Sequence, residues 1–106
     1  MKLLTQAIRN SLPSLGSSER LPHDQIVVHT KFFTPDSSWT WYAVEFDGDN
    51  TFFGLVSGFE VELGYWNLSE MEAARGPLGL PVERDLWVKP APLSQIPEYA
   101  RWVGAT

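Results

Sequence analysis

The sequence contains no cysteine, so neither disulfide bonds nor thiolate chemistry can contribute to this protein. The zinc-binding patterns that depend on cysteine are excluded for the same reason. No apolar run approaches the roughly 20 residues that a helix needs to cross a bilayer. The stretch MKLLTQAIRNSL is interrupted by polar residues before any signal-like segment develops. We therefore expect a cytoplasmic protein that is neither secreted nor inserted into a membrane.

Motifs of the common catalytic sites are also missing. The sequence has no G-x-S-x-G, which would expose a nucleophilic serine, and neither of the two glycine-rich motifs that cradle phosphates. Its two histidines, His23 and His29, could with Asp24 form at most a poor metal site. We therefore predict a protein that is not an enzyme and that uses no metal or other cofactor.

Positive charge is absent from the middle of the chain. Between Phe32 and Ala74 there is no Lys or Arg. That stretch holds eight of the 13 acidic residues, namely Asp36, Glu45, Asp47, Asp49, Glu60, Glu62, Glu70 and Glu72. Such a segment argues against direct nucleic-acid binding, which needs clustered Lys and Arg, and favours a basic partner. A small acidic protein could equally use these charges only to stay soluble.

The length of 106 residues and an apolar content of 43% predict one folded domain, residues 1–106. Hydrophobic periodicity and turn signals divide it into short elements. We predict helices over 3–12 and 68–75, strands over 25–33, 39–46, 51–58, 59–65 and 82–89, and a proline-interrupted tail. This arrangement is α+β, with an antiparallel meander of four to five strands and two to three short helices.

The central strands are apolar on both sides. Alternation predicts Trp41 and Ala43 on one face of the sheet, and Tyr42, Val44 and Phe46 on the other. An antiparallel sheet with one wet face would instead alternate apolar with polar residues. The second face must therefore be covered, either by helices of this chain or by a partner, which could be a second copy.

The stretch GFEVELGYW has a polar side that carries Glu60 and Glu62, which predicts a strand near an edge of the sheet. Two carboxylates about 6–7 Å apart on a strand approach the spacing of a glycosidase pair. They project in parallel from one element, however, rather than across a cleft, so we favour a wet surface or a partner surface.

We expect strands 39 to 66 to gather these acids into one contiguous negative patch, flanked by tryptophans of the kind that anchor interfaces. The predicted partner-binding residues are Asp36, Glu45, Asp47, Asp49, Glu60, Glu62, Trp66 and Trp87. Most of the other aromatic side chains are assigned to the core.

Three segments, KFFTPDSSWTWYAVEFD, FFGLVSGFEVELGYWNLSEME and RGPLGLPVERDLWVKPAPLSQI, together make the chain resemble a known family. That family is domain of unknown function 2958, whose members are small bacterial and mobile-element proteins. The resemblance implies no established activity and no catalytic residues. It implies a context of plasmids, integrated elements and phages, in which small proteins directed against host defences are frequent.

Together these observations predict a small acidic interaction protein of a mobile element. We expect it to inhibit a host nucleic-acid-targeting defence system, in the manner of anti-CRISPR or anti-restriction proteins, by occupying a basic surface. The alternative is a plasmid or host accessory module for protein–protein interaction, homodimeric or not, with no anti-defence role.

Overall fold

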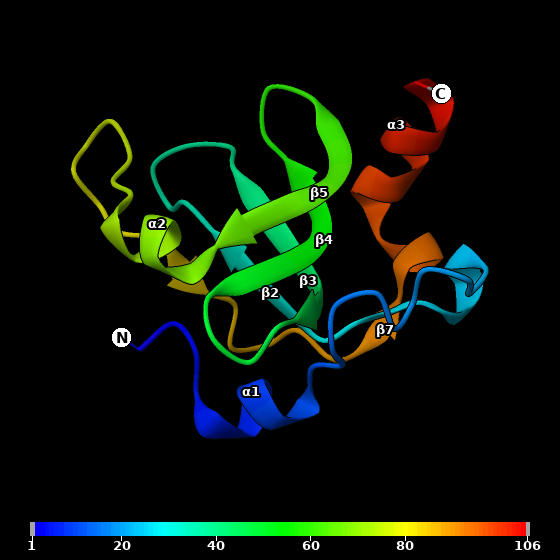
Figure 1. Ribbon diagram of the computed structural model, residues 1–106. Coiled ribbons are helices and arrows are strands. Elements are labelled where there is room, and N and C mark those ends of the chain that lie inside the picture. The colour runs from blue at the N-terminus through cyan, green and yellow to red at the C-terminus, as the bar shows by residue number, and fades with distance from the viewer. Residues whose placement is uncertain (1, 106) are drawn as a thin grey trace.

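The computed structural model describes residues 2–105, which fold around a five-stranded antiparallel sheet (Figure 1). The strand order is β5-β4-β3-β2-β6. These strands are β2 (Thr30–Phe33), β3 (Thr40–Phe46), β4 (Thr51–Ser57), β5 (Val61–Asn67) and β6 (Glu83–Arg84). A second, two-stranded sheet pairs β1 (Val27–Val28) with β7 (Ala91–Pro92).

Three α-helices and two short 3-10 helices flank the sheets. They are α1 (Gln6–Ser11), α2 (Leu68–Ala73), α3 (Pro97–Ala105), η1 (His23–Gln25) and η2 (Leu93–Gln95). The predicted α+β class and the antiparallel meander are therefore confirmed. Among the described residues, none of the helices has the length and apolar content that a bilayer crossing requires.

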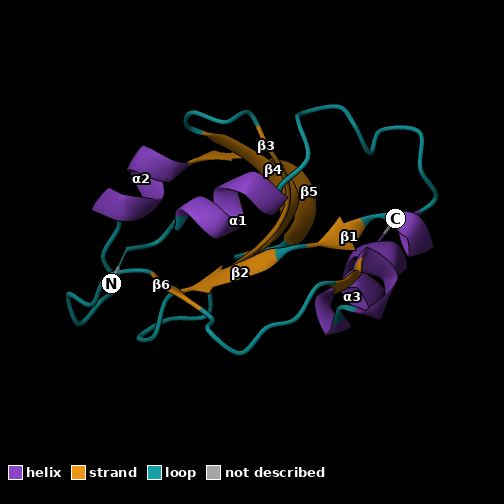
Figure 2. Cartoon of the chain, turned by 90° about the horizontal axis from the view of Figure 1, so that it is seen from below, coloured by secondary structure: helices purple, strands orange, loops and turns teal. Residues whose placement is uncertain are grey.

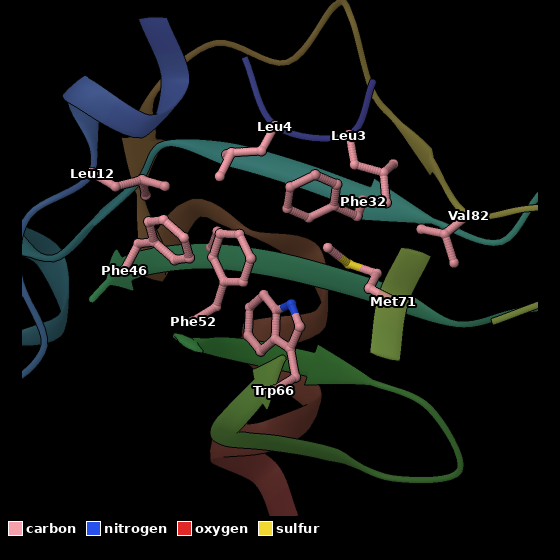
Figure 3. Close-up of a cluster of buried hydrophobic side chains, with 10 residues drawn as sticks. Leu3, Leu4, Leu12, Phe32, Phe46, Phe52, Trp66, Met71 and Val82 are labelled. Atoms are coloured by element: carbon pink, nitrogen blue, oxygen red, sulfur yellow. The ribbon is translucent and has the colours of Figure 1, made fainter. Parts of the chain in front are cut away.

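The first face of the sheet carries an aromatic core. Phe32, Phe46, Phe52 and Trp66 are buried there together with leucines of the N-terminal segment, Met71 of α2 and Val82 (Figure 3). Phe52 and Trp66 stack with ring centroids 5.3 Å apart. Burying these rings supplies much of the hydrophobic driving force for folding.

The second face is covered by the chain itself, which answers the question left open by the sequence. Tyr42, Val44 and Leu55 are buried under Leu93 and Ile96, and Tyr99 and Trp102 of α3 pack against this cluster. Helices α1 and α2 lie on one side of the sheet and α3 on the other (Figure 2). The two-sided apolar pattern of the central strands therefore requires no partner.

One residue of β3 lies on the face opposite to the one predicted. The β3–β4 register shifts between Ala43 and Glu45, which marks a bulge. Because a bulge adds one residue to the strand, the alternation reverses after it. Phe46 therefore joins Ala43 in the first core instead of Tyr42 and Val44 in the second.

Several element boundaries differ from the predicted ones. The first helix begins only at Gln6, because Thr5 caps it by accepting a hydrogen bond from the backbone N–H of Ile8. The strand predicted over 25–33 is divided at His29, since its two halves pair with different strands. The helix predicted over 68–75 ends at Ala73, and the strand predicted over 82–89 is only Glu83–Arg84.

The strand predicted over 59–65 is β5, and it begins two residues later, because 58–60 form the turn from β4. It pairs only with β4 among the described strands, so its predicted position at an edge is confirmed. Val61 and Leu63 pack into the second core, whereas Glu62 lies on the opposite face.

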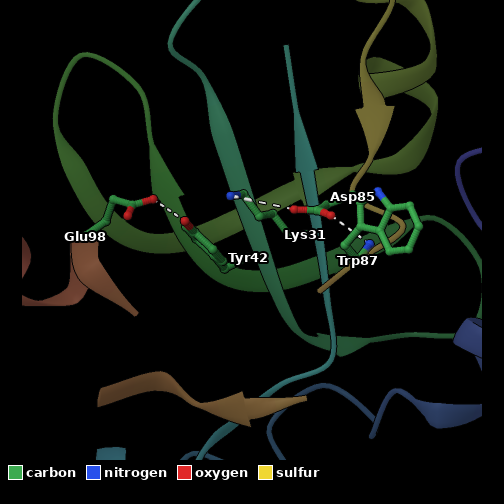
Figure 4. A network of polar contacts seen from close by, with 5 residues as sticks. All are labelled: Lys31, Tyr42, Asp85, Trp87 and Glu98. Atoms are coloured by element: carbon green, nitrogen blue, oxygen red, sulfur yellow. Dashed lines mark hydrogen bonds and ion pairs between the residues drawn. The ribbon is translucent and has the colours of Figure 1, made fainter. Parts of the chain in front are cut away.

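A polar network fastens α3 to the second face. Tyr42 of β3 donates a hydrogen bond from its hydroxyl to a carboxylate oxygen of Glu98 (Figure 4). The ammonium of Lys31 lies 5.5 Å from the centre of the Tyr42 ring and 3.9 Å from a carboxylate oxygen of Asp85. These contacts connect the β2–β3 pair to the C-terminal helix on one side and to the segment after β6 on the other.

Candidate functional site

The acidic residues of the middle segment are spread along the length of β4, and one of them, Glu45, is buried. Asp47 and Asp49 lie in the turn that precedes β4, whereas Glu60 and Glu62 follow the end of β4. β4 has seven residues, which corresponds to about 20 Å of extended chain. Asp47 and Asp49 are therefore about one strand length away from Glu60 and Glu62. Glu70 of α2 lies toward the Asp47 end, because Asn50 of the same turn bonds to Ser69 of α2.

Two of the predicted partner-binding acids have structural roles. Glu45 is only 2% exposed, and its carboxylate accepts hydrogen bonds from the backbone N–H groups of Gly16 at 2.7 Å and Ser18 at 2.9 Å. Its assignment to a partner surface is therefore wrong. Asp36 accepts hydrogen bonds from the backbone N–H groups of Leu78 at 2.8 Å and Leu80 at 3.3 Å, and so orders the 76–80 loop.

Asp47 organises the β3–β4 turn. One of its carboxylate oxygens accepts hydrogen bonds from the backbone N–H groups of Asp49 (2.8 Å), Asn50 (2.9 Å) and Thr51 (3.0 Å). These bonds, that from Thr51 first, lower the pKa of Asp47 because they stabilise the ionised carboxylate. Asp49 is exposed in the same turn.

The two predicted tryptophan anchors lie in different environments. Trp66 is 9% exposed and stacks on Phe52, so it belongs mainly to the core. Trp87 is 87% exposed and follows β6, the strand at the opposite edge from β5. The structure therefore does not bring Trp66 and Trp87 together.

A hollow of about 520 Å³ opens on the first face, between β3, β5 and α2. Three tryptophans line it, Trp39, Trp41 and Trp66, and Glu62 and Glu70 also belong to its lining. Among the described residues that line it, none is Lys or Arg. We call this hollow the aromatic groove.

The strand register brings these residues together. On the first face, Trp41 lies opposite Val56, which lies opposite Glu62, so one row crosses three strands from an indole to a carboxylate. The next row consists of the small residues Ala43, Gly54 and Gly64. Gly64 leaves open space, since nothing lies within 4 Å of the point a Cβ would occupy.

Trp39 closes one end of the aromatic groove. Its ring centroid lies 5.9 Å from that of Trp41 and 5.5 Å from that of Phe59, which is itself 95% exposed. The ring packs on the backbone of Gly58, where a Cβ would come within 2.4 Å of Trp39 Cζ3. A glycine at position 58 therefore allows this tryptophan to lie where it does.

A second hollow, of about 390 Å³, adjoins the first and shares Trp39, Trp41 and Ala74 with it. It is lined further by Arg75, Gly76 and Pro77. The two indoles thus form a half-buried ridge between two depressions, one with carboxylates and one with a guanidinium.

Indole faces and carboxylates together suit a cationic ligand. The face of an aromatic ring attracts an ammonium or guanidinium group, and tryptophan does so most strongly. A nearby carboxylate adds a charge-assisted hydrogen bond. A volume of about 520 Å³ falls within the range of about 300–1,000 Å³ that is common for ligand sites.

The histidines lie outside this groove. The Nδ1 atom of His23 is 2.9 Å from the Tyr99 hydroxyl, and burial lowers the pKa of His29. The described residues contain no group of three or more His, Asp or Glu side chains placed to hold a metal ion.

Trp39, Trp41 and Glu70 line the groove but are absent from the predicted partner-binding residues. The sequence assigns Trp39 and Trp41 to the core and counts Glu70 only among the acids of the middle segment. In the structure the Asn67 side chain donates a hydrogen bond to Glu70 Oε1 at 3.2 Å. The first turn of α2 is capped from the β3–β4 turn, where the Asn50 side chain accepts a hydrogen bond from the backbone N–H of Ser69 at 2.9 Å. The groove could have been predicted only from the strand register, which pairs Trp41 with Val56 and Val56 with Glu62.

Comparison with known proteins identifies the family of this chain. The family described as "Protein of unknown function (DUF2958)" matches residues 3–106, essentially the whole chain, so the protein belongs to it. No curated protein and no solved structure matches the chain.

Proposed function

We propose that this DUF2958 protein is a non-catalytic interaction protein whose aromatic groove receives Lys or Arg side chains from a basic surface of a partner protein. The observation that carries the proposal is the shared lining of one hollow by Trp39, Trp41 and Trp66 with Glu62 and Glu70. A cation in this hollow would contact indole faces and carboxylates together, with no positive side chain of the lining to oppose it.

The class of partner follows from the same chemistry. Proteins that bind nucleic acids present clustered Lys and Arg, because they must neutralise phosphates. A protein that occupies such a surface competes with the nucleic acid for it. We therefore propose that the partner is a nucleic-acid-binding component of a host defence complex, and that the protein acts for a mobile element as an inhibitor of anti-CRISPR or anti-restriction type.

A labelled octapeptide of alternating lysine and threonine tests the groove directly by fluorescence anisotropy. The double variant Glu62→Gln/Glu70→Gln should bind this peptide at least about tenfold more weakly, since charge-assisted hydrogen bonds are worth about 1.5–3 kcal/mol each. The matched control is Glu19→Gln/Asp24→Asn, which also removes two exposed acids but leaves the groove lining unchanged, and it should bind like the wild type. Equal weakening by both variants would mean that only overall charge matters.

The anti-defence role is tested in cells that carry a restriction or CRISPR system. Expression of the wild-type chain should raise the plating efficiency of a targeted phage, and Glu62→Gln/Glu70→Gln should abolish that effect. If the peptide binds but plating never changes in any such system, the alternative of an accessory interaction module is favoured. Sedimentation of the free chain tests the homodimer that this alternative allows.

A further inference from the structure

The outer side of β5 carries unpaired backbone groups. Two hydrogen bonds at the ends of the β4–β5 hairpin show which residue pairs of the two strands are hydrogen-bonded. Gly58 N–H donates to the Glu60 carbonyl (3.0 Å), and Leu68 N–H donates to the Asn50 carbonyl (2.8 Å). In an antiparallel ladder with this register, every second residue bonds to the neighbouring strand. Glu62 and Gly64 therefore face β4, and Leu63 and Tyr65 direct their N–H and C=O groups outward.

This edge lacks several of the features with which proteins usually block strand addition. β5 is seven residues long and contains no Pro and no Lys, and its register with β4 is continuous. Helix α3 packs against Val61 and Leu63 on the second face, whereas Tyr65 is 67% exposed. The accessible part of the edge is thus centred on Gly64 and Tyr65.

Gly64 connects this edge to the aromatic groove. It belongs to the lining of the groove, and the space that a side chain would fill there is open. On a strand added beside β5, the residue next to Gly64 would direct its side chain to the same face. That side chain would pass over Gly64 toward Trp66, with Glu62 one pleat away on the same face of β5.

We propose that an extended basic segment of the partner adds to β5 as a sixth strand and places a Lys or Arg beside Gly64, inside the aromatic groove. This inference rests on the proposed function and names its binding mode. The added strand is expected to be basic, because Glu62 on β5 and Glu60 just before it attract positively charged side chains. A second copy of β5 would bring two strands with the same negative charges together, which opposes self-pairing.

Hydrogen exchange with the lysine–threonine octapeptide distinguishes this mode from simple groove binding. The amides of Leu63 and Tyr65 should exchange rapidly in the free protein and become protected when the peptide is bound. If the peptide binds and these amides remain unprotected, strand addition is wrong while the proposed function stands. If the peptide does not bind at all, both proposals fail.

A pair of variants isolates the backbone contribution. Tyr65→Pro removes an outward N–H, and Tyr65→Ala removes the same side chain but keeps the N–H. We expect Tyr65→Pro to bind the octapeptide at least about fivefold more weakly than Tyr65→Ala, the usual effect of one lost hydrogen bond. Equal affinities of the two folded variants would overturn strand addition.

Modified peptides give the same test with an unaltered protein. One octapeptide is N-methylated at its threonines and another at its lysines, so that each lacks the N–H groups of one edge. Strand addition predicts a loss of binding of about tenfold or more for only one of them, and the affected peptide reports whether the added strand is antiparallel or parallel. An equal effect of the two modifications would contradict the proposal.

Gly64→Val tests the opening into the groove. Gly64 does not have a positive φ, and valine is a better strand former, so the variant should fold. Its side chain would occupy the space through which the ligand's side chain must pass, and we expect binding of the octapeptide to weaken at least about tenfold. Unchanged affinity of the folded variant would show that no side chain enters at this point.

Discussion

The carboxylate of Glu45 receives two hydrogen bonds from Ser18, one from its backbone N–H at 2.9 Å and one from its hydroxyl. A third comes from the backbone N–H of Gly16. Both Glu45 and Ser18 are buried, so this contact fixes the long connection between α1 and η1 onto the bulge of β3. A buried carboxylate without such donors would be strongly unfavourable.

Glu45→Gln should therefore destabilise the fold. The amide supplies one acceptor oxygen in place of two and turns an NH2 group toward donors, which leaves buried groups unsatisfied. We expect a loss of about 1–3 kcal/mol in the free energy of unfolding, measured by urea denaturation. Ser18→Ala, which removes only the hydroxyl donor, should lose less. A Glu45→Gln variant as stable as the wild type would contradict this role.

Asp47 should make the β3–β4 turn sensitive to acid. Its pKa is lowered in the folded protein by the hydrogen bonds from Thr51 and Asp49, so its contribution to stability is present above the unfolded value of about 3.9 and is lost as the pH falls through the folded value. The urea midpoint of the wild type should decline below about pH 4 more steeply than that of Asp47→Asn. Asp49→Asn, whose parent carboxylate does not bond to the turn, should retain the decline of the wild type.

Local patterns predicted the strands well because each central strand reads as a continuous apolar run bounded by turn residues. The position of β5 at an edge followed from a different pattern, the alternation of apolar and polar residues. Glu62 on one side and Val61 and Leu63 on the other indicate a strand with one face in water. Phe46 was predicted on the wrong face because a single-residue bulge reverses the pleat, and no residue type in the sequence marks this bulge.

The groove could not be read from the sequence for a related reason. It depends on the pairing of Trp41 with Val56 and of Val56 with Glu62, residues that are distant along the chain. Charge counting found the acidic segment but gave no information on where β4 would separate its members. Of the predicted partner-binding residues, only Glu62 and Trp66 line the groove, and the fold places the others elsewhere or buries them.

Gly58 should be necessary for the position of Trp39. In Gly58→Ala the new Cβ would lie 2.4 Å from Trp39 Cζ3, so the indole must move and the end of the groove must change shape. We expect a loss of stability of about 1–3 kcal/mol, as for other overpacked sites, and an altered near-UV circular dichroism spectrum from the displaced tryptophan. Gly64→Ala is the control, because that position has open space. Equal stability of the two variants would show that Trp39 does not depend on Gly58.

The Tyr42–Glu98 hydrogen bond should give the fold an alkaline limit. Burial, the hydrogen bond to Glu98 and the negative charges of Glu98 and Asp85 raise the pKa of Tyr42 well above its ordinary value. The folded state therefore favours the neutral phenol, so the stabilisation is complete below the unfolded value of about 10 and is lost as the pH rises above it.

Tyr42→Phe tests this limit by urea unfolding at pH 8 and above pH 10. At pH 8 the variant should be less stable by about 1.5–3 kcal/mol, the usual contribution of a hydrogen bond to a charged group. The difference in stability between the wild type and Tyr42→Phe should shrink above pH 10. There the Tyr42 phenol ionises in the unfolded wild type, which lowers the stability of its folded state, whereas the variant has no phenol at this position. Glu98→Gln, which keeps an acceptor but removes one of the charges, should show a weaker alkaline decline than the wild type. A Tyr42→Phe variant that declines as steeply as the wild type would place the alkaline sensitivity in another group.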